Sequence, residues 1–235
     1  MSHRALFHSQ VPPTLAHMPS ALDQRLFLFL NADRGHAWLD TLMAVLSSFD
    51  FWLPLMIVAG LLVAWRGGFR ARAMLACLLL SLVLIEAAFV NPLKHAFGRP
   101  RPTDMVADSR SINLAPIRPR ILALLYPIRV KPGSPDKNPP RGRSFPSGHA
   151  SNMFCFATIL AAFYGMRGAS FFILAASVAL SRVMTGSHWP SDVVISALLS
   201  IALTSILLRL YNWLWVRFGP RMAPLLAAKH RSLFE

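Results

Sequence analysis

Three short polar segments, each next to a long apolar run, carry the residues whose types and spacing could do chemistry. The segment 181–192, SRVMTGSHWPSD, contains Arg182, His188 and Asp192. Positions four apart share one face of a helix, so Asp192 can accept a hydrogen bond from one ring nitrogen of His188. The other ring nitrogen then keeps its lone pair and can attack an electrophile. Pro190 permits this arrangement only if the helix begins close to it.

The other two segments supply cations and a helix start. Segment 94–102, KHAFGRPRP, contains Lys94, Arg99 and Arg101. Segment 144–151, SFPSGHAS, is typical of a turn that opens a helix. The free backbone N–H groups at a helix N-terminus are suited to binding an anion.

Together these groups suit phosphoryl transfer through a phosphohistidine. Cations, helix-end amides and the hydroxyl of Ser147 would neutralise the phosphate oxygens. Two of the histidines in these segments, His149 and His188, supply the reacting groups: one would attack the phosphorus and the other would protonate the leaving oxygen.

The composition of the chain indicates a membrane protein. Only 14% of its 235 residues are charged, against roughly 25% in soluble proteins. Apolar runs recur with lengths near the roughly 17–25 residues that cross a bilayer. The formal net charge of +14 comes from basic residues in loops and tails between these runs. That distribution favours membrane topology and anionic lipid over nucleic acid, so we expect the bilayer as partner and no nucleic acid.

The apolar runs predict an all-α, polytopic membrane helix bundle of five to six spans with an interfacial N-terminal helix. Residues 22–48 predict that interfacial helix and a second helix leading into the membrane, or else a broken first span. The expected spans are 51–65, 74–90 (ending at Asn91 and Pro92), 150–165, 170–180 and 193–208, the last closed by Arg209. Because successive spans alternate in direction, the three polar segments should meet at one face of the membrane.

Three regions lie outside these spans. Residues 1–20 predict a flexible tail, 213–235 a basic cytoplasmic tail, and 103–144 a long extracytoplasmic loop without regular structure inside the transmembrane domain 21–212. The loop holds eight Lys or Arg against three Asp. Cys77 and Cys155 lie inside apolar runs and are interpreted as small hydrophobic residues.

The polar segments resemble the three-part signature of the type 2 phosphatidic acid phosphatase (PAP2) superfamily. The matches are Lys-x6-Arg-Pro in 94–102, Pro-Ser-Gly-His in 146–149 and Ser-Arg-x5-His-x3-Asp in 181–192. The resemblance extends over roughly residues 24–212 and implies an integral-membrane lipid phosphatase. This superfamily also includes haloperoxidases and glucose-6-phosphatase.

The resemblance implies a role for each matched residue. His188 would be the nucleophile, Asp192 the group that orients it, and His149 the acid that protonates the leaving group. The implied phosphate ligands are Lys94, Arg101, Ser147, Gly148 and Arg182. The resemblance implies no metal and no cofactor, and Arg99 ranks below Arg101 because its spacing differs from the signature.

Several alternatives stay open at this point. A lipid phosphotransferase would use the same phosphoenzyme, and a non-catalytic membrane protein could retain the motif. The substrate would be a phospholipid or an isoprenoid lipid phosphate, and the basic loop favours undecaprenyl pyrophosphate or lipid A over phosphatidate. We expect the bacterial inner membrane, with the site facing the periplasm or exterior. Sequence does not determine the oligomeric state.

A few polar residues have simpler interpretations. His36, His95 and His230 are interpreted as structural, because none lies in a matched motif. Glu86 lies inside a span, where a charge usually needs a partner. Structural pairing and a role beneath the site are equally open for it.

Overall fold

A computed structural model describes residues 19–31, 36–136 and 144–235. The predicted tail 1–20 therefore lies outside the described residues except for its last two positions. The helices are α1 (Ala21–Asn31), α2 (Ala37–Ser47), α3 (Phe49–Arg66), α4 (Phe69–Ile85), α5 (Asn91–Phe97), α6 (Gly148–Tyr164), α7 (Met166–Ala169), α8 (Phe171–Met184), α9 (Pro190–Met222) and α10 (Pro224–Lys229). Shorter elements are the π-helix η2 (Glu86–Val90), the 3-10 helices η3 (Pro102–Asp104) and η4 (Arg120–Leu125), and the strands β1 (Arg110–Asn113) and β2 (Arg129–Pro132).

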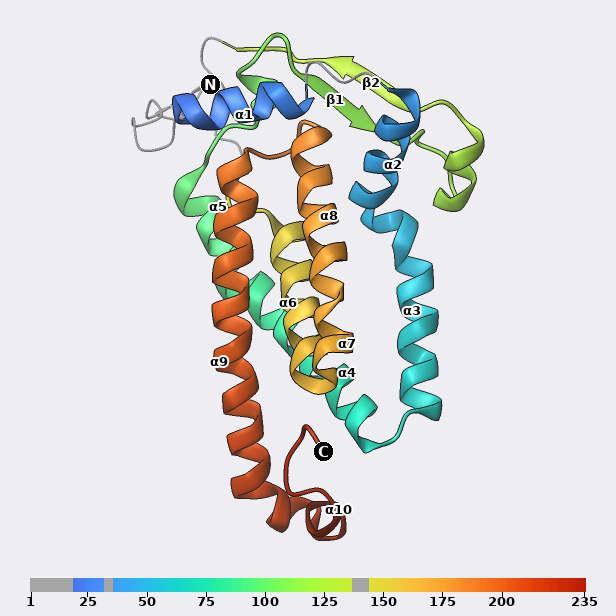
Figure 1. Ribbon diagram of the computed structural model, residues 1–235, viewed down its shortest axis with the longest axis vertical. Coiled ribbons are helices and arrows are strands. Elements are labelled where there is room, and N and C mark those ends of the chain that lie inside the picture. The colour runs from blue at the N-terminus through green and yellow to red at the C-terminus, as the bar shows by residue number, and fades with distance from the viewer. Residues whose placement is uncertain (1–18, 32–35, 137–143) are drawn as a thin grey trace, which may run out of the picture.

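The architecture confirms the predicted membrane helix bundle. Four helical stretches of the described chain are long and apolar enough to cross a membrane: 49–66, 69–104, 166–184 and 190–222. A fifth helix, α6, has 17 residues and packs against α4, α8 and α9 at the centre of the bundle (Figure 1). Helix α1 lies across one end of the bundle, as expected for an interfacial helix (Figure 1).

Helix α3 stands at the edge of the bundle and buries none of its residues. Its described contacts are chiefly with α4 and η4. The helix is apolar on all sides, and such a surface is stable only in an apolar solvent such as the bilayer interior.

Two helices continue past the residues at which their spans were predicted to end. The helix expected to end at Asn91 and Pro92 continues as α5, because the π-helix Glu86–Val90, which ends two residues before Pro92, loosens the turn where the proline ring lacks a hydrogen bond. The last span does not close at Arg209 but continues to Met222. The residues after Arg209 contain no helix breaker before Gly219, and a long arginine side chain can reach out of the apolar layer.

The loop 103–144 was predicted without regular structure, and its described part is ordered instead. Strands β1 and β2 pair antiparallel, with Ser111 opposite Lys131 and Asn113 opposite Arg129. The backbone N–H of Ile112 donates to the carbonyl of Thr185 at 3.2 Å, which ties the ribbon to the end of α8. The loop thus forms a cap over the end of the bundle (Figure 1).

Asn31, at the end of α1, holds this cap in place. Its buried side chain donates to the carbonyls of Arg110, at 2.8 Å, and Met184, at 2.7 Å, and accepts from the Arg110 N–H at 2.6 Å. One amide therefore joins α1, β1 and α8. Its hydrogen bonds join residues 79 and 153 positions apart in the sequence, so no local sequence pattern predicts them.

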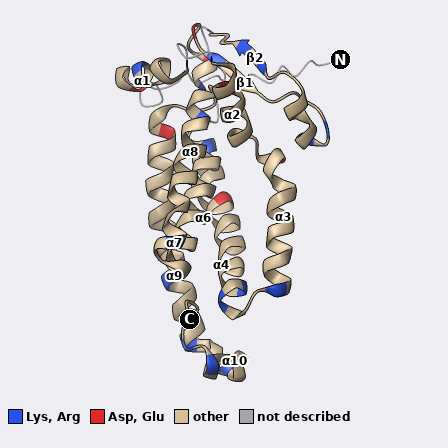
Figure 2. Ribbon diagram, turned by 45° about the vertical axis from the view of Figure 1, so that its right-hand side comes forward, with Lys and Arg blue, Asp and Glu red and all other residues tan. Residues whose placement is uncertain are grey.

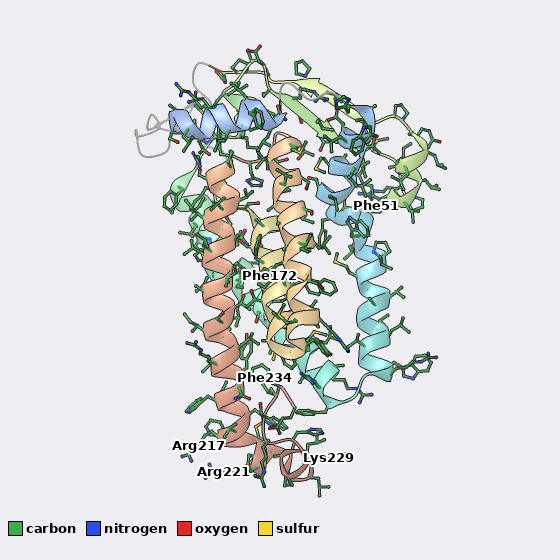
Figure 3. All side chains as sticks on the ribbon, viewed as in Figure 1. Phe51, Phe172, Arg217, Arg221, Lys229 and Phe234 are labelled. Atoms are coloured by element: carbon green, nitrogen blue, oxygen red, sulfur yellow. The ribbon has the colours of Figure 1, made fainter. Side chains whose placement is uncertain are left out.

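The charges gather at the two ends of the bundle (Figure 2). One end carries the cap, and the other carries the turn between α3 and α4 and the tail with Arg217, Arg221 and Lys229 (Figure 3). His230 stacks on Phe69 with ring centroids 4.2 Å apart, which is the structural role expected for it.

Candidate active site

The three polar segments come together at the capped end of the bundle, as the alternation of spans predicted. Ser144 links them directly. Its N–H donates to the carbonyl of Arg99 at 3.0 Å, its carbonyl lies 2.6 Å from Nδ1 of His188, and its hydroxyl donates to Oδ2 of Asp192 at 2.5 Å. Ser144 is fully buried.

The turn after α8 sets the position of His188. Gly186 has a φ of +78°, and a Cβ there would lie 2.4 Å from the carbonyl oxygen of Arg110, so only glycine fits. His188 follows with 4% exposure. Because its Nδ1 faces a carbonyl oxygen, Nδ1 must carry the proton, and the neutral ring keeps its lone pair on Nε2.

The expected hydrogen bond between His188 and Asp192 is replaced by the bond to the Ser144 carbonyl. The Asp192 Oδ2 lies 3.9 Å from Nδ1 of His188, too far for a hydrogen bond. The Asp192 carboxylate is fully buried and accepts instead from Ser144 and from the Trp189 N–H at 3.0 Å. It acts on His188 by charge and through Ser144.

A guanidinium bridges Asp192 to a second buried carboxylate that the sequence did not reveal. Arg99 donates to Oδ1 of Asp192 at 2.5 Å and to Oδ2 of Asp23 at 2.6 Å. Asp23, in the first turn of α1, also accepts from the Ser191 N–H at 2.9 Å. An acidic residue in an apolar interfacial helix indicates that its carboxylate has a partner, but the sequence did not show that this partner is Arg99.

His149 and Arg182 line a cavity of about 210 Å³ at the same end. Arg182 Nη1 donates to the Ser47 carbonyl at 3.1 Å and to the Ser47 hydroxyl. Its Nε and the Nε2 of His149 are buried and have no hydrogen-bond partner among the described residues. Two such atoms in one cavity indicate a polar ligand, since buried polar groups are otherwise paired.

The remaining lining of this cavity comes from the α2–α3 junction and the loop cap. It consists of Ala44, Ser47, Ser48, Phe49, Asp50, Ile112, Asn113, Leu114 and Arg120. The ring of Phe49 meets His149 edge-on, with centroids 6.4 Å apart. The loop thus forms part of the cavity wall on the side away from the bundle.

Lys94 and Glu86 pair beneath the start of α6. Lys94 Nζ lies 4.0 Å from Oε1 of Glu86, which favours structural pairing for this intramembrane acid. A Cβ at Gly148 would lie 3.4 Å from Lys94 Nζ and 3.6 Å from Oε2 of Glu86. Glycine therefore lets the helix N-terminus approach this pair closely.

Ser147 and Arg101 have different settings. The Ser147 hydroxyl caps α6 by accepting from the Ala150 N–H at 3.4 Å, and its N–H donates to Ser196 Oγ at 2.8 Å. Arg101 is exposed and acts electrostatically on Arg182 and His188. The assignment of both, with Lys94, Gly148 and Arg182, as phosphate ligands stays a prediction.

Burial determines the protonation of His188. Desolvation lowers the pKa of its imidazole below the ordinary value, Arg182 and Arg101 lower it further, and Asp192 opposes part of the shift. The neutral, nucleophilic form is therefore favoured. In the described part of the chain, no group of three His, Cys, Asp or Glu side chains could hold a metal ion.

Comparison with known proteins places this geometry in context. The family model described as "PAP2 superfamily" matches residues 74–215, more than half of the chain. The lipid A 4'-phosphatase of Bacteroides thetaiotaomicron is 29% identical over 77% of this chain and 72% of its own length. The lipid A 1-phosphatase of Rhizobium etli is 27% identical over 57% of this chain but only 45% of its own length.

The chain is also similar to a solved structure. The crystal structure of Aquifex aeolicus LpxE superposes with a TM-score of 0.56 and 29% identity, covering 81% of this chain and 96% of that one. The likeness therefore extends beyond the motifs to most of the chain.

The bridge through Arg99 generates a stability prediction. Arg99→Gln should lower the free energy of unfolding by about 3–5 kcal/mol, because two buried carboxylates lose their shared cation. Thermal unfolding of the detergent-purified protein measures the effect. Arg101→Gln, the same change at an exposed arginine, is the matched control. Equal melting temperatures for the two variants would contradict a structural role for the bridge.

Proposed function

Because this chain belongs to the PAP2 superfamily and is a membrane lipid phosphatase of that type, we propose that it removes a phosphate from lipid A. Undecaprenyl pyrophosphate is the alternative substrate. The observation that carries the choice is the likeness to lipid A phosphatases, which covers most of this chain and most of the Bacteroides protein. The relatives differ in the phosphate that they remove, so either position on the saccharide is a candidate.

In the proposed reaction, the substrate phosphate enters the cavity lined by His149 and Arg182. Nε2 of His188 attacks the phosphorus, a nitrogen–phosphorus bond forms, and the bond to the lipid oxygen breaks. His149 gives that oxygen its proton. Water then attacks the phosphohistidine with His149 as base, and inorganic phosphate leaves.

The cations would stabilise the charge that develops on the phosphate. Arg182 Nε is a buried donor without a described partner, which supports its assignment as a ligand. Lys94 and the N-terminus of α6 lie against each other, so a phosphate at the helix start would meet both. Arg101 adds long-range attraction from its exposed position.

Phosphate release from a lipid panel tests the proposal. The wild-type protein should release phosphate from lipid A, and His188→Ala and His149→Ala should each reduce kcat by at least about a thousandfold, since each removes a group needed for bond making or breaking. Asp192→Asn should retain part of the activity, because the Ser144 carbonyl still orients His188. The panel also contains undecaprenyl pyrophosphate, phosphatidylglycerophosphate and phosphatidate.

The outcome separates the alternatives. A protein that releases phosphate only when an acceptor lipid is added is a phosphotransferase. Unchanged release by His188→Ala would exclude the phosphohistidine route.

The pKa of His188 predicts the pH dependence. An imidazole nucleophile must be neutral, so activity persists as pH falls until the lowered pKa of His188 is reached, and is lost below it. The acid limb of kcat/KM should therefore lie below pH about 6.5, the ordinary value. Asp192→Asn removes the charge that raises this pKa, so its acid limb should move to still lower pH. The exposed Asp108→Asn is the control, and a limb that moves upward in Asp192→Asn would contradict the assignment.

We also propose that the site faces away from the cytoplasm. Support comes from the opposite end of the bundle, where Arg217, Arg221 and Lys229 lie (Figure 3), because cytoplasmic ends of membrane proteins carry excess Lys and Arg. The loop cap is also basic, which by the same rule would favour a cytoplasmic location for the site. Binding of a polyanionic substrate would account for the basic residues of the cap on the outer face.

Cysteine labelling tests the orientation. Ser134→Cys, exposed in the cap, should react with a membrane-impermeant maleimide on intact cells, or on spheroplasts where an outer membrane is present. Ala228→Cys, exposed in α10 at the opposite end of the bundle, should react only after lysis. The native Cys77 and Cys155 are buried and give low background. The reverse pattern would place the site in the cytoplasm.

A further inference from the structure

A second cavity adjoins the catalytic one. It has a volume of about 330 Å³ and lies within the loop cap. Its lining consists of Ser111, Asn113, Leu114, Pro116, Arg120, Arg129 and Lys131. Three of these residues, Asn113, Leu114 and Arg120, also line the catalytic cavity. The two spaces therefore share a wall.

The lining of the second cavity suits an anion. It includes three cations, Arg120, Arg129 and Lys131, and no acidic residue. The strand register places Lys131 opposite Ser111 and Arg129 opposite Asn113. Since residues that pair directly and alternate along a strand share one face, these four side chains belong to the same face of the ribbon.

The three cations differ in the hydrogen bonds and ion pairs that they form with the protein. Arg120 donates to the Ala115 carbonyl at 2.8 Å, and its Nε lies 3.8 Å from the Asp50 carboxylate, a residue of the catalytic cavity. Arg129 and Lys131 are exposed on β2, and among the described residues neither forms an ion pair. Arg120 thus belongs to both cavities, and Arg129 and Lys131 are available for a ligand.

We propose that the second cavity is a subsite for a second phosphate on the same headgroup as the phosphate being hydrolysed. This inference rests on the proposed function. In this proposal, Arg129 and Lys131 determine the specificity for lipids with two phosphates. Phosphate hydrolysis itself takes place at the cavity lined by His149 and Arg182. Arg120, in the shared wall, contacts both ends of the headgroup.

The shared wall also distinguishes two kinds of doubly phosphorylated lipid. The phosphates of a diphosphate are joined by one oxygen, whereas the two cavities are separate spaces that have Asn113, Leu114 and Arg120 as common lining residues. A saccharide with phosphate esters at two separate positions can place one group on each side of this wall. The subsite therefore fits a bisphosphorylated saccharide lipid and not a diphosphate.

Binding measurements in the His188→Ala background test the subsite without requiring turnover. The probes are bisphosphorylated lipid A, monophosphorylated lipid A and undecaprenyl pyrophosphate, each in mixed detergent micelles. The double variant Arg129→Gln, Lys131→Gln should raise the Kd of bisphosphorylated lipid A about tenfold or more and leave the other two lipids within twofold. The double variant Arg25→Gln, Arg118→Gln removes two exposed cations outside both cavities and should change none of the three.

Each other outcome overturns the assignment. Equal losses for both forms of lipid A would mean general attraction to an anionic surface, and no loss would mean no subsite. A loss confined to undecaprenyl pyrophosphate would make the cavity a diphosphate site. Wild-type phosphate release is measured in parallel: its absence from every lipid would refute the proposed function, while the binding result still decides the subsite.

Discussion

The three bonds of Ser144 are the constraint on which the rest of the site depends. Its N–H, carbonyl and hydroxyl reach Arg99, His188 and Asp192, one group for each partner. A buried polar group without its partner costs about 1–3 kcal/mol, so the three segments stabilise one another only when all are in place. The helices α5, α6, α8 and α9 must accordingly end at one level, which is what a bundle of alternating spans provides.

The charges around Ser144 extend this constraint to the periphery. Asp192 and Asp23 share the guanidinium of Arg99, so helix α1 is held across the end of the bundle by the same group that holds Asp192. A buried ion pair adds little net stability but fixes a geometry, because its disruption leaves an unpaired charge. The interfacial helix, which a hydropathy pattern would place only on the membrane surface, is thus a structural part of the site.

Features that depend on residue spacing and on the alternating direction of successive spans were predictable from the sequence. Features that depend on contacts between residues far apart in the sequence were not. The approach of His188 and Asp192, the meeting of the three segments and the interfacial α1 belong to the first kind. The bond from His188 to the Ser144 carbonyl belongs to the second, because i,i+4 spacing brings two side chains near without deciding which acceptor is nearer. Asp23 and the β1–β2 ribbon were missed for a related reason. Their partners lie far away in sequence, and strands of four residues are too short to show alternation.

The separation of Asp192 from His188 bears on how the proposed nucleophile works. A direct bond to a carboxylate would favour the protonated imidazole, which cannot attack, whereas a bond to a neutral carbonyl orients the ring at a smaller cost to the lone pair. Asp192 is held 3.9 Å away because Arg99 and Ser144 occupy its oxygens. At that distance its charge can still stabilise the cationic ring of a phosphohistidine. In the proposed mechanism, this arrangement would keep His188 neutral before attack and stabilise its positive charge afterwards, and Arg99 would hold Asp192 at the distance that allows both.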